Sequence, residues 1–204
     1  QKINSKDDLV TFWASLRNQV NSEEAELPVV NFYGHAEGKE WAHFSNFYPS
    51  EFVFKLPDFG QEAGAFPEQV EVNCSEKAIM LCKAVIMDDP DTFAKIAKET
   101  SPKKIKGLGR KVGPWDQEKW NLHVVTVAKQ TVLQKFSQCE QHREILLSTG
   151  DKLIAETTRM DKNWGIGFNL GQAGEKQPWK WAEKNGGNIL GFALMWAREQ
   201  IKLQ

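Results

Sequence analysis

A carboxylate and an amine lie seven residues apart in a stretch rich in apolar residues, at Glu76 and Lys83. If the stretch is helical, seven residues make about two turns, so both side chains lie at nearly the same azimuth, roughly 10 Å apart along the axis. Met80 and Met87 share this stripe. A carboxylate can transfer protons and an amine can attack carbon, so the stripe is a candidate wall of a catalytic pocket. The alternative is a solvated Glu and Lys, which the methionines disfavour because exposed stripes seldom carry them.

Two clusters of aromatic and polar residues follow no helical or strand period. Phe44 and Asn46 belong to the first, and Asp161, Trp164 and Gly165 belong to the second. An aromatic ring can stack on a flat heterocycle, an amide can hydrogen-bond to its edge, and glycine lets the backbone approach a ligand closely. Buried aromatic residues usually belong to the core, but the position of these on irregular segments favours a ring-binding site.

The segment 95–111 is basic, with seven Lys and Arg residues against the single acid Glu99. Its glycines have the spacing GxGxxxG and follow no apolar strand, so they are not the fingerprint of a dinucleotide site. Arg110 lies between Gly109 and Gly113 and is the best placed of these residues for bidentate contact with a phosphate. The alternative is that the segment is a solvated helical face.

The composition disfavours several classes of protein. The 204 residues carry 26 Lys and Arg against 27 Asp and Glu, and this balance disfavours a protein that holds nucleic acid mainly by bulk electrostatics. The longest apolar run is about nine residues, whereas a membrane span needs about 20. The chain opens with no signal-peptide pattern. We therefore expect no membrane association and an intracellular protein, cytoplasmic or nuclear.

Cysteine and histidine are too scattered to indicate a metal site. The three cysteines include no CxxC pair, and the four histidines show neither HxxxH nor HExxH spacing. A structural zinc ion needs four converging Cys or His ligands, so we expect no metal. An odd cysteine count in a chain long enough to build its own core also favours reduced thiols.

Hydrophobic periodicity predicts an α+β protein that is mostly helical. The residues up to 26 show a helical period, with Ser5 at the N-cap position. We predict further helices at 75–87, 92–98, 101–109, 116–136, 138–147 and 188–203, strands at 27–33, 51–56 and 69–72, and a possible strand at 152–156. The few short strands gather near the N-terminal half and do not alternate with helices, which disfavours a doubly wound parallel sheet.

Several short motifs follow one another in order along the chain. They are Phe44-Ser-Asn-Phe-Tyr-Pro49, Ser75-Glu76 followed by Cys82-Lys83-Ala84, Gly107-Leu-Gly-Arg110, Trp120, Lys135-Phe136, Leu146-Leu-Ser-Thr-Gly150, Ile154-Ala-Glu156, Asp161-Lys-Asn-Trp164-Gly-Ile-Gly167 and Gly187-Asn-Ile-Leu-Gly191. In this pattern the chain resembles the NADAR superfamily, which includes the YbiA-like riboflavin-intermediate N-glycosidases. The resemblance covers about residues 29–203. It implies a single NADAR-like N-glycosidase domain at 27–204, preceded by an N-terminal helical extension at 1–26.

The chain also departs from the family pattern. Residues 57–69 look like an insertion between two strands, and residues 168–185 lengthen the loop after Trp164. Lys77 and Ala78 follow the Ser-Glu pair, where the family often has an aromatic residue or histidine. These departures bear on fine substrate contacts more than on the chemistry.

The resemblance implies an N-glycosidase that needs no cofactor. Two kinds of substrate are known in the family: ADP-ribose attached to guanine in nucleic acid, and a ribosylamino-pyrimidinone phosphate from riboflavin synthesis. In both, a ribose is joined to the exocyclic amine of a guanine-like ring. The form of the 44–50 and 161–167 motifs favours removal of ADP-ribose from modified guanine. The alternatives are the riboflavin-intermediate N-glycosidase and a non-catalytic module that binds ADP-ribose or NAD.

The same resemblance implies roles for particular residues. The sugar–amine bond can open to an imine, which Lys83 can attack to form a Schiff base, while Glu76 transfers protons and Asp161 stabilises positive charge. The predicted substrate-binding residues are Phe44, Asn46, Arg110, Trp120, Trp164, Gly165 and Asn188. A competing mechanism has no covalent step: Glu76 activates water directly and Lys83 binds phosphate. The expected partner is an ADP-ribosylated nucleic acid or a nucleotide-like small molecule, with no obligatory protein partner.

Overall fold

The computed structural model describes residues 3–36 and 38–204. In these residues helices predominate and the strands are short, which confirms the predicted α+β, mostly helical class. The elements are α1 (Lys6–Ser15), the 3-10 helix η1 (Leu16–Gln19), β1 (Val29–Phe32), the 3-10 helix η2 (Ala42–Phe44), β2 (Phe52–Lys55), β3 (Gln69–Val72), α2 (Ser75–Ile86), α3 (Pro90–Lys98), α4 (Pro102–Gly109), α5 (Gln117–Gln138), α6 (Glu140–Leu147), β4 (Leu153–Glu156), α7 (Pro178–Glu183) and α8 (Ile189–Lys202).

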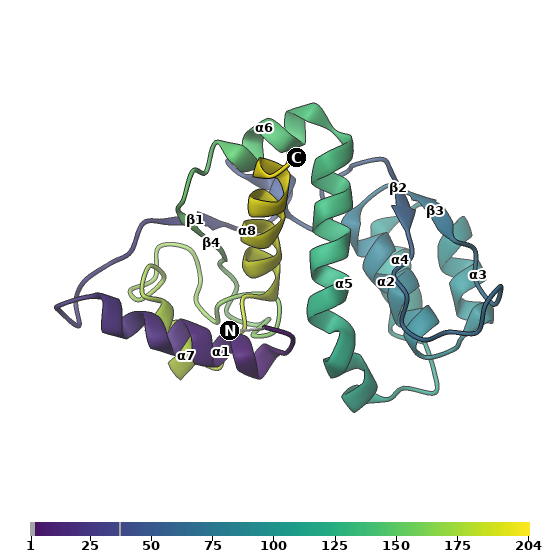
Figure 1. Ribbon diagram of the computed structural model, residues 1–204, viewed down its shortest axis with the longest axis horizontal. Helices are drawn as coiled ribbons and strands as arrows, with labels where there is room; N and C mark the ends of the chain where they lie inside the picture. The colour runs from purple at the N-terminus through teal and green to yellow at the C-terminus, as the bar shows by residue number, and fades with distance from the viewer. Residues whose placement is uncertain (1–2, 37) are drawn as a thin grey trace.

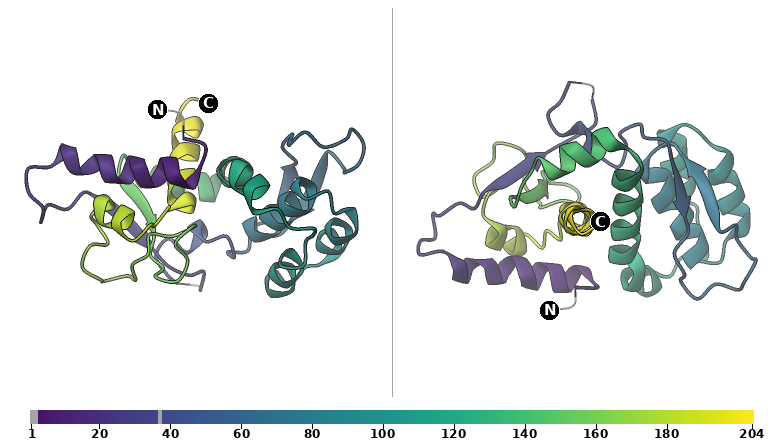
Figure 2. Two further views of the ribbon diagram at one scale, coloured as in Figure 1. Left: turned by 90° about the horizontal axis from the view of Figure 1, so that it is seen from below. Right: turned by 45° about the horizontal axis from the view of Figure 1, so that its top comes forward.

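The long helix α5 lies at the centre of the molecule (Figure 1). Helix α8 packs on one side of it and α2 on the other. Beyond α8 lie β1, β4, α1 and α7, whereas α3, α4, β2 and β3 gather around α2, as all the views show (Figures 1 and 2). The two halves of the molecule therefore meet along α5.

The strands form two separate pairs. Strands β2 and β3 are antiparallel, with Phe52 opposite Val72. Strands β1 and β4 are parallel, with Val29 opposite Leu153 and Phe32 opposite Glu156. The possible strand at 152–156 is thus a real one, and its partner lies far away in the sequence. This pairing fixes where the C-terminal end of β4, and with it Glu156, lies in the molecule.

Helix α2 is buried around almost its whole circumference. Every one of its residues except Lys83 is buried, because α3, α4 and α5 all pack against it. Glu76 is only 6% exposed, so it is not a solvated surface carboxylate.

The N-terminal helix α1 packs against α7. Ser5 and Asp8 form a capping box at its start, each side chain accepting a hydrogen bond from the other residue's backbone N–H. The fully buried indole of Trp13 donates its Nε1 hydrogen to the carbonyl oxygen of Gly187 at 2.8 Å. Helix α7 was not predicted from the sequence, because it is only six residues long and gives little periodic signal.

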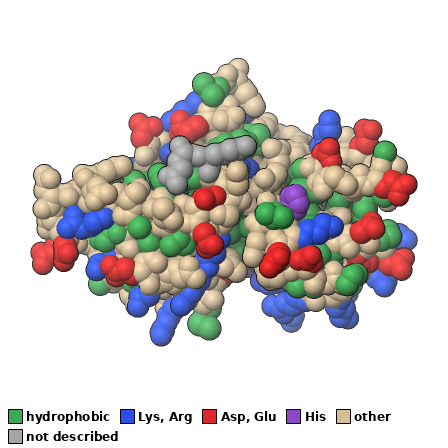
Figure 3. Space-filling model, turned by 60° about the horizontal axis from the view of Figure 1, so that its bottom comes forward, with side chains coloured by type: hydrophobic (Ala, Val, Ile, Leu, Met, Phe, Trp, Pro, Cys, Tyr) green, Lys and Arg blue, Asp and Glu red, His purple; other side chains and the backbone are tan. Residues whose placement is uncertain are grey.

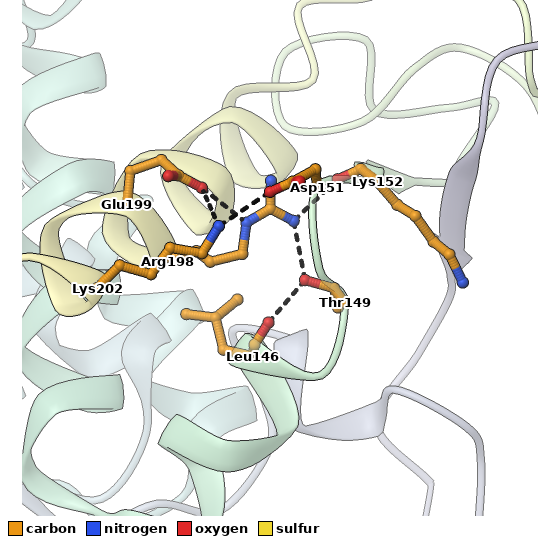
Figure 4. Close-up of polar contacts among 7 residues, drawn as sticks. All are labelled: Leu146, Thr149, Asp151, Lys152, Arg198, Glu199 and Lys202. Carbon is orange, nitrogen blue, oxygen red and sulfur yellow. Dashed lines mark hydrogen bonds and ion pairs between the residues drawn. The ribbon is translucent and has the colours of Figure 1, made fainter.

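A buried arginine ties the last helix to the turn before β4 (Figure 4). Nη1 of Arg198 donates to Oγ1 of Thr149 at 2.9 Å and to the carbonyl oxygen of Lys152 at 2.8 Å. Oγ1 of Thr149 in turn donates to the carbonyl oxygen of Leu146. These bonds hold the N-terminal end of β4 in place. Among the described residues, no helix combines the length and apolar character needed to cross a membrane.

Candidate active site

A cavity of about 320 Å³ lies between the two halves of the molecule. Its walls come from α2, α4, the start of α5, the turn after η2 and the segment that follows β4. Seven of the ten predicted site residues line it: Asn46, Glu76, Lys83, Arg110, Trp120, Asp161 and Trp164. The structure therefore brings the carboxylate–amine stripe, both irregular segments and the basic segment to one place.

Glu76 lies in the first turn of α2, and its backbone N–H donates to the carbonyl oxygen of Asn46 at 2.8 Å. This bond joins the 44–50 segment to the start of the helix, which brings Asn46 and Glu76 to the same wall. Burial raises the pKa of Glu76 above its usual value, against the opposing positive charges of Lys106 and Lys83. A carboxylate of raised pKa is suited to exchanging protons near neutral pH.

Lys83 lies two turns further along α2, with its ammonium group beside two neighbouring indole rings. Nζ lies 5.0 Å from the ring centroid of Trp115 and 5.2 Å from that of Trp120. Burial lowers the pKa of Lys83; the charge of Glu76 opposes this shift, and the charge of Lys106 adds to it. A lowered pKa increases the fraction of neutral amine, which is the nucleophilic form.

Helix α4 approaches α2 closely at Gly109. A Cβ atom at this position would overlap the side chain of Met80, so glycine lets the two helices pack closely without displacing that side chain. The approach brings Lys106 and Arg110 to the cavity. Nζ of Lys106 lies 4.9 Å from the ring centroid of Phe47, which also lines the cavity.

The segment after β4 turns sharply at Asp161. Oδ1 of Asp161 accepts hydrogen bonds from the backbone N–H groups of Asn163 at 3.0 Å and Trp164 at 2.9 Å. This turn places the carboxylate and the indole at the cavity wall. Gly165 does not line the cavity. A Cβ atom there would lie 2.8 Å from the carbonyl oxygen of Glu156, so Gly165 allows the segment to pack against β4.

Two further predicted substrate-binding residues lie outside the cavity. Phe44 is buried in the core, where its ring stacks on that of Trp41 at 5.4 Å between centroids. Asn188 is also fully buried, and its side chain donates to the carbonyl oxygen of Ile154 and accepts from the backbone N–H of Glu156. The side chains of both residues are packed or hydrogen-bonded away from the cavity. In this structure the two residues therefore support the cavity walls from behind.

Several other residues that line the cavity were not among the predicted site residues, including Phe47, Lys106, Trp115 and Glu156. Glu156 ends β4, and its Oε2 atom is shielded from solvent with no hydrogen-bond partner among the described residues. Burial and the negative charges of Asp161 and Glu76 raise its pKa to about 8. A carboxylate that ends an apolar strand just before an irregular segment was the available sequence signal.

We expect catalysis to need no metal ion. Within the described part of the chain, no group of three or more His, Cys, Asp or Glu residues is arranged to hold one, and the cavity offers an amine and carboxylates for the chemistry instead. Treatment with EDTA followed by gel filtration should leave kcat unchanged. Loss of activity that one particular metal restores would contradict this prediction.

The fold and the cavity define a small α+β protein in which an amine, carboxylates, aromatic rings and cations face one cavity. The chain belongs to the NADAR family, since the model of the NADAR domain matches residues 31–202. It is 34% identical over 168 residues to Protein irg-1 of Caenorhabditis elegans, covering 78% of each chain. It is 35% identical over 172 residues to N-glycosidase R617 of Acanthamoeba polyphaga mimivirus, covering 84% of this chain and 95% of the relative.

A solved structure shares the fold. The NMR structure of the E. coli protein YbiA matches with a TM-score of 0.63 and 24% identity, covering 88% of each chain. The family match begins after α1, so this helix lies outside the matched domain although it packs against the body of the protein.

Proposed function

We propose that the protein is an N-glycosidase that hydrolyses the bond between a ribose and the exocyclic amine of a guanine-like base. The substrate that we propose is ADP-ribosylated guanine in nucleic acid, from which the enzyme releases ADP-ribose. The names of the relatives support the general activity, since R617 and YbiA are both called N-glycosidases. The form of the 44–50 and 161–167 motifs supports the choice of substrate.

The observation that carries the proposal is that one cavity holds every chemical group the reaction needs. Lys83 supplies an amine, Glu76 a carboxylate, Trp164 a flat surface for a base, and Arg110 a cation for a phosphate. Small-molecule sites usually measure roughly 300–1,000 Å³, so a cavity of about 320 Å³ suits a ribose with one base. The rest of a nucleic acid substrate would stay outside, with the modified base turned out of its stack.

Charge on the surface fits a substrate with phosphates. Exposed lysines of the basic segment, including Lys103, Lys104 and Lys111, lie close in sequence to the cavity residues Lys106 and Arg110. Lys and Arg side chains also gather along the lower edge of the face in Figure 3. Positive charge at this one place would guide phosphates to the site. Because the protein as a whole is nearly neutral, the rest of its surface would not bind nucleic acid.

In the proposed reaction, the sugar–amine bond opens to an imine and Lys83 attacks C1. The base leaves with its amine, and C1 stays joined to Nζ as a Schiff base that water then hydrolyses. Glu76 accepts and returns protons during these steps. Asp161 stabilises the positive charge on the imine through its position at the same cavity wall.

One experiment separates this proposal from its alternatives. Purified protein is incubated with DNA carrying ADP-ribosylated guanine, and separately with the ribosylamino-pyrimidinone phosphate. Free ADP-ribose from the first supports the proposed substrate, whereas ribose 5-phosphate from the second alone supports the riboflavin-intermediate N-glycosidase. Tight binding of ADP-ribose with neither product would show a non-catalytic module and overturn the proposal.

The substitution Arg110→Ala should weaken binding of a phosphorylated substrate. Loss of a hydrogen bond to a charged group costs roughly 1.5–3 kcal/mol, which corresponds to an increase of about 10- to 150-fold in KM. Steady-state kinetics measure this, with Lys55→Ala as the matched control because Lys55 is exposed on β2 and lies outside both the cavity and the basic segment. A KM within about twofold of the wild-type value would contradict the phosphate role of Arg110.

A further inference from the structure

Glu156 has a carboxyl group that the reaction described above does not use. The residue lines the cavity together with Glu76 and Asp161. Its Oε2 atom exposes less than 1 Å² to solvent and hydrogen-bonds to no described residue. An ionised carboxylate in this position would leave a charged oxygen without water or a partner, which is costly. The surroundings therefore favour the neutral acid.

The backbone of Glu156 is held firmly. Its N–H donates to Oδ1 of Asn188, and its carbonyl oxygen accepts hydrogen bonds from the N–H groups of Ile166 and Thr158. The bonds of Arg198 to Thr149 and Lys152 fix the other end of β4 (Figure 4). The carboxyl group is thus presented to the cavity by a rigid strand, as a catalytic group requires.

The negative charges near Glu156 raise its pKa, as its burial does. Asp161, from the segment after β4, and Glu76, from α2, carry negative charge that disfavours a third carboxylate, whereas Lys106 from α4 opposes them. The net effect raises the pKa of Glu156 to about 8. The pKa of Glu76 is raised too, but Lys106 and Lys83 both oppose that shift. Two neighbouring carboxyl groups with different charges around them are suited to opposite roles, one as acid and one as base.

We propose that Glu156 is the acid that donates a proton to the departing base, while Glu76 acts as the base toward water. The inference rests on the proposed N-glycosidase function and assigns a second catalytic carboxyl group to the same site. An amine leaves carbon readily only when its nitrogen receives a proton, so the step needs an acid whether or not Lys83 forms a covalent intermediate.

The proton balance of the step is simple. Nζ of Lys83 has formed a bond to C1, and the bond between C1 and the exocyclic nitrogen breaks. The electron pair goes to that nitrogen, which takes the proton from Glu156 and leaves as the free base. Water then adds to C1 of the protonated enzyme imine and gives one proton to Glu76. The resulting carbinolamine breaks at the C1–Nζ bond: Nζ keeps the electron pair and takes the hydroxyl proton, which frees neutral Lys83 and leaves C1 as the aldehyde of the open sugar. The proton on Glu76 returns through solvent to Glu156. The net change is one water consumed.

The isosteric substitution Glu156→Gln tests the proposal on both nucleic acid and pyrimidinone substrates. We expect kcat to fall by about 100-fold or more, the scale of general acid catalysis, with KM within about threefold. Wild-type kcat/KM should decline as the pH rises through about 8, where Glu156 loses its proton, and this decline should be absent in the variant. Glu71→Gln, at an exposed position on β3, is the matched control.

The outcomes distinguish the two proposals. If the wild-type protein releases neither ADP-ribose nor ribose 5-phosphate, the proposed function is wrong, and the proposed role of Glu156 is wrong as well. If the wild-type protein is active and Glu156→Gln keeps both its kcat and the decline above pH 8, only the role of Glu156 is overturned. A purely structural role would change the melting temperature without removing the decline.

A second measurement needs no activity. NMR of protein carrying ¹³C in the glutamate carboxyl groups follows the ionisation of each one, and Glu156→Gln or Glu156→Asp assigns the signal of Glu156. A midpoint near pH 8 supports the inference. A midpoint near the ordinary value of about 4.3 for glutamate would overturn it.

Discussion

Sodium borohydride added during turnover is expected to fix a ribose-containing adduct on Lys83 and to stop the reaction. Borohydride reduces a Schiff base to a stable secondary amine, so peptide mass mapping should find the added mass on the peptide that contains Lys83. The substitution Lys83→Ala should remove the adduct and lower kcat by roughly 1,000-fold or more, the scale on which loss of a catalytic nucleophile acts. This is the largest effect that we predict.

The surroundings of Lys83 shift its side chain toward the neutral amine, which is the nucleophilic form. Burial lowers its pKa from the usual 10.5, and the positive charges of Lys106 and Arg110 lower it further. Glu76 and the rings of Trp115 and Trp120 favour the ammonium form, so the shift is a balance. Because the neutral amine attacks, the rate of adduct formation should rise with pH up to the lowered pKa of Lys83.

Lys104→Ala is the control for this experiment, because Lys104 is exposed and lies on the neighbouring helix α4. It should keep both the adduct and kcat. If the wild-type protein forms no adduct and Lys83→Ala retains substantial kcat, the covalent mechanism is wrong. Glu76 would then activate water directly, and Lys83 would bind phosphate.

Glu76→Gln is expected to lower kcat by roughly 100- to 10,000-fold, since both mechanisms need a base at this position. Glutamine has nearly the same shape as glutamate and fills the same space in the cavity, so the KM should change little. The wild-type rate should fall as the pH drops through the raised pKa of Glu76, because the base form is lost there. This acidic decline should be absent from the residual activity of the variant.

The same substitution should leave the protein at least as stable as the wild type at pH 7. The folded state raises the pKa of Glu76 above the 4.5 of the unfolded chain, so the folded state binds more protons between those two values. Stability contributed by Glu76 therefore falls as the pH rises through this window. Removing the charge removes that cost, and the melting temperature at pH 7 should stay the same or increase.

Glu71→Gln again serves as the control, with unchanged kcat and an unchanged melting temperature. If Glu76→Gln lowers kcat only in proportion to a fall in folded protein, the effect is structural and the assignment of Glu76 as base is wrong. Circular dichroism at the assay temperature measures the folded fraction in both variants.

The helix that carries the proposed catalytic residues Glu76 and Lys83 was predictable because helical spacing is a local property. Ser75 to Ile86 forms one helix, and the repeat of 3.6 residues alone places Glu76, Met80 and Lys83 along one line. The sequence also predicted the three N-terminal strands and the principal helices, because each has a periodic pattern of its own. The short helix α7 has too few residues for such a pattern.

The residues that face the cavity could not all be predicted from local sequence patterns. Phe44, Gly165 and Asn188 have residue types that suit ligand binding, yet the structure uses them to pack the core or to hold β4. Glu156 was quoted within a motif and given no role. Nothing within four residues of any of these positions reveals whether the side chain meets a ligand or a distant part of the chain.

The sequence by itself determined the helical content, the position of Glu76 and Lys83 on one helix, and the membership of the family, since these depend on local periods and ordered motifs. The tertiary structure decided that β4 pairs with β1, that Asn188 holds the backbone of Glu156, and that this carboxyl group meets Glu76 and Asp161 at one cavity. The physical reason is burial. Elements that are far away in the sequence remove water from a side chain and bring charges near it. Its pKa and its access to a ligand depend on both effects.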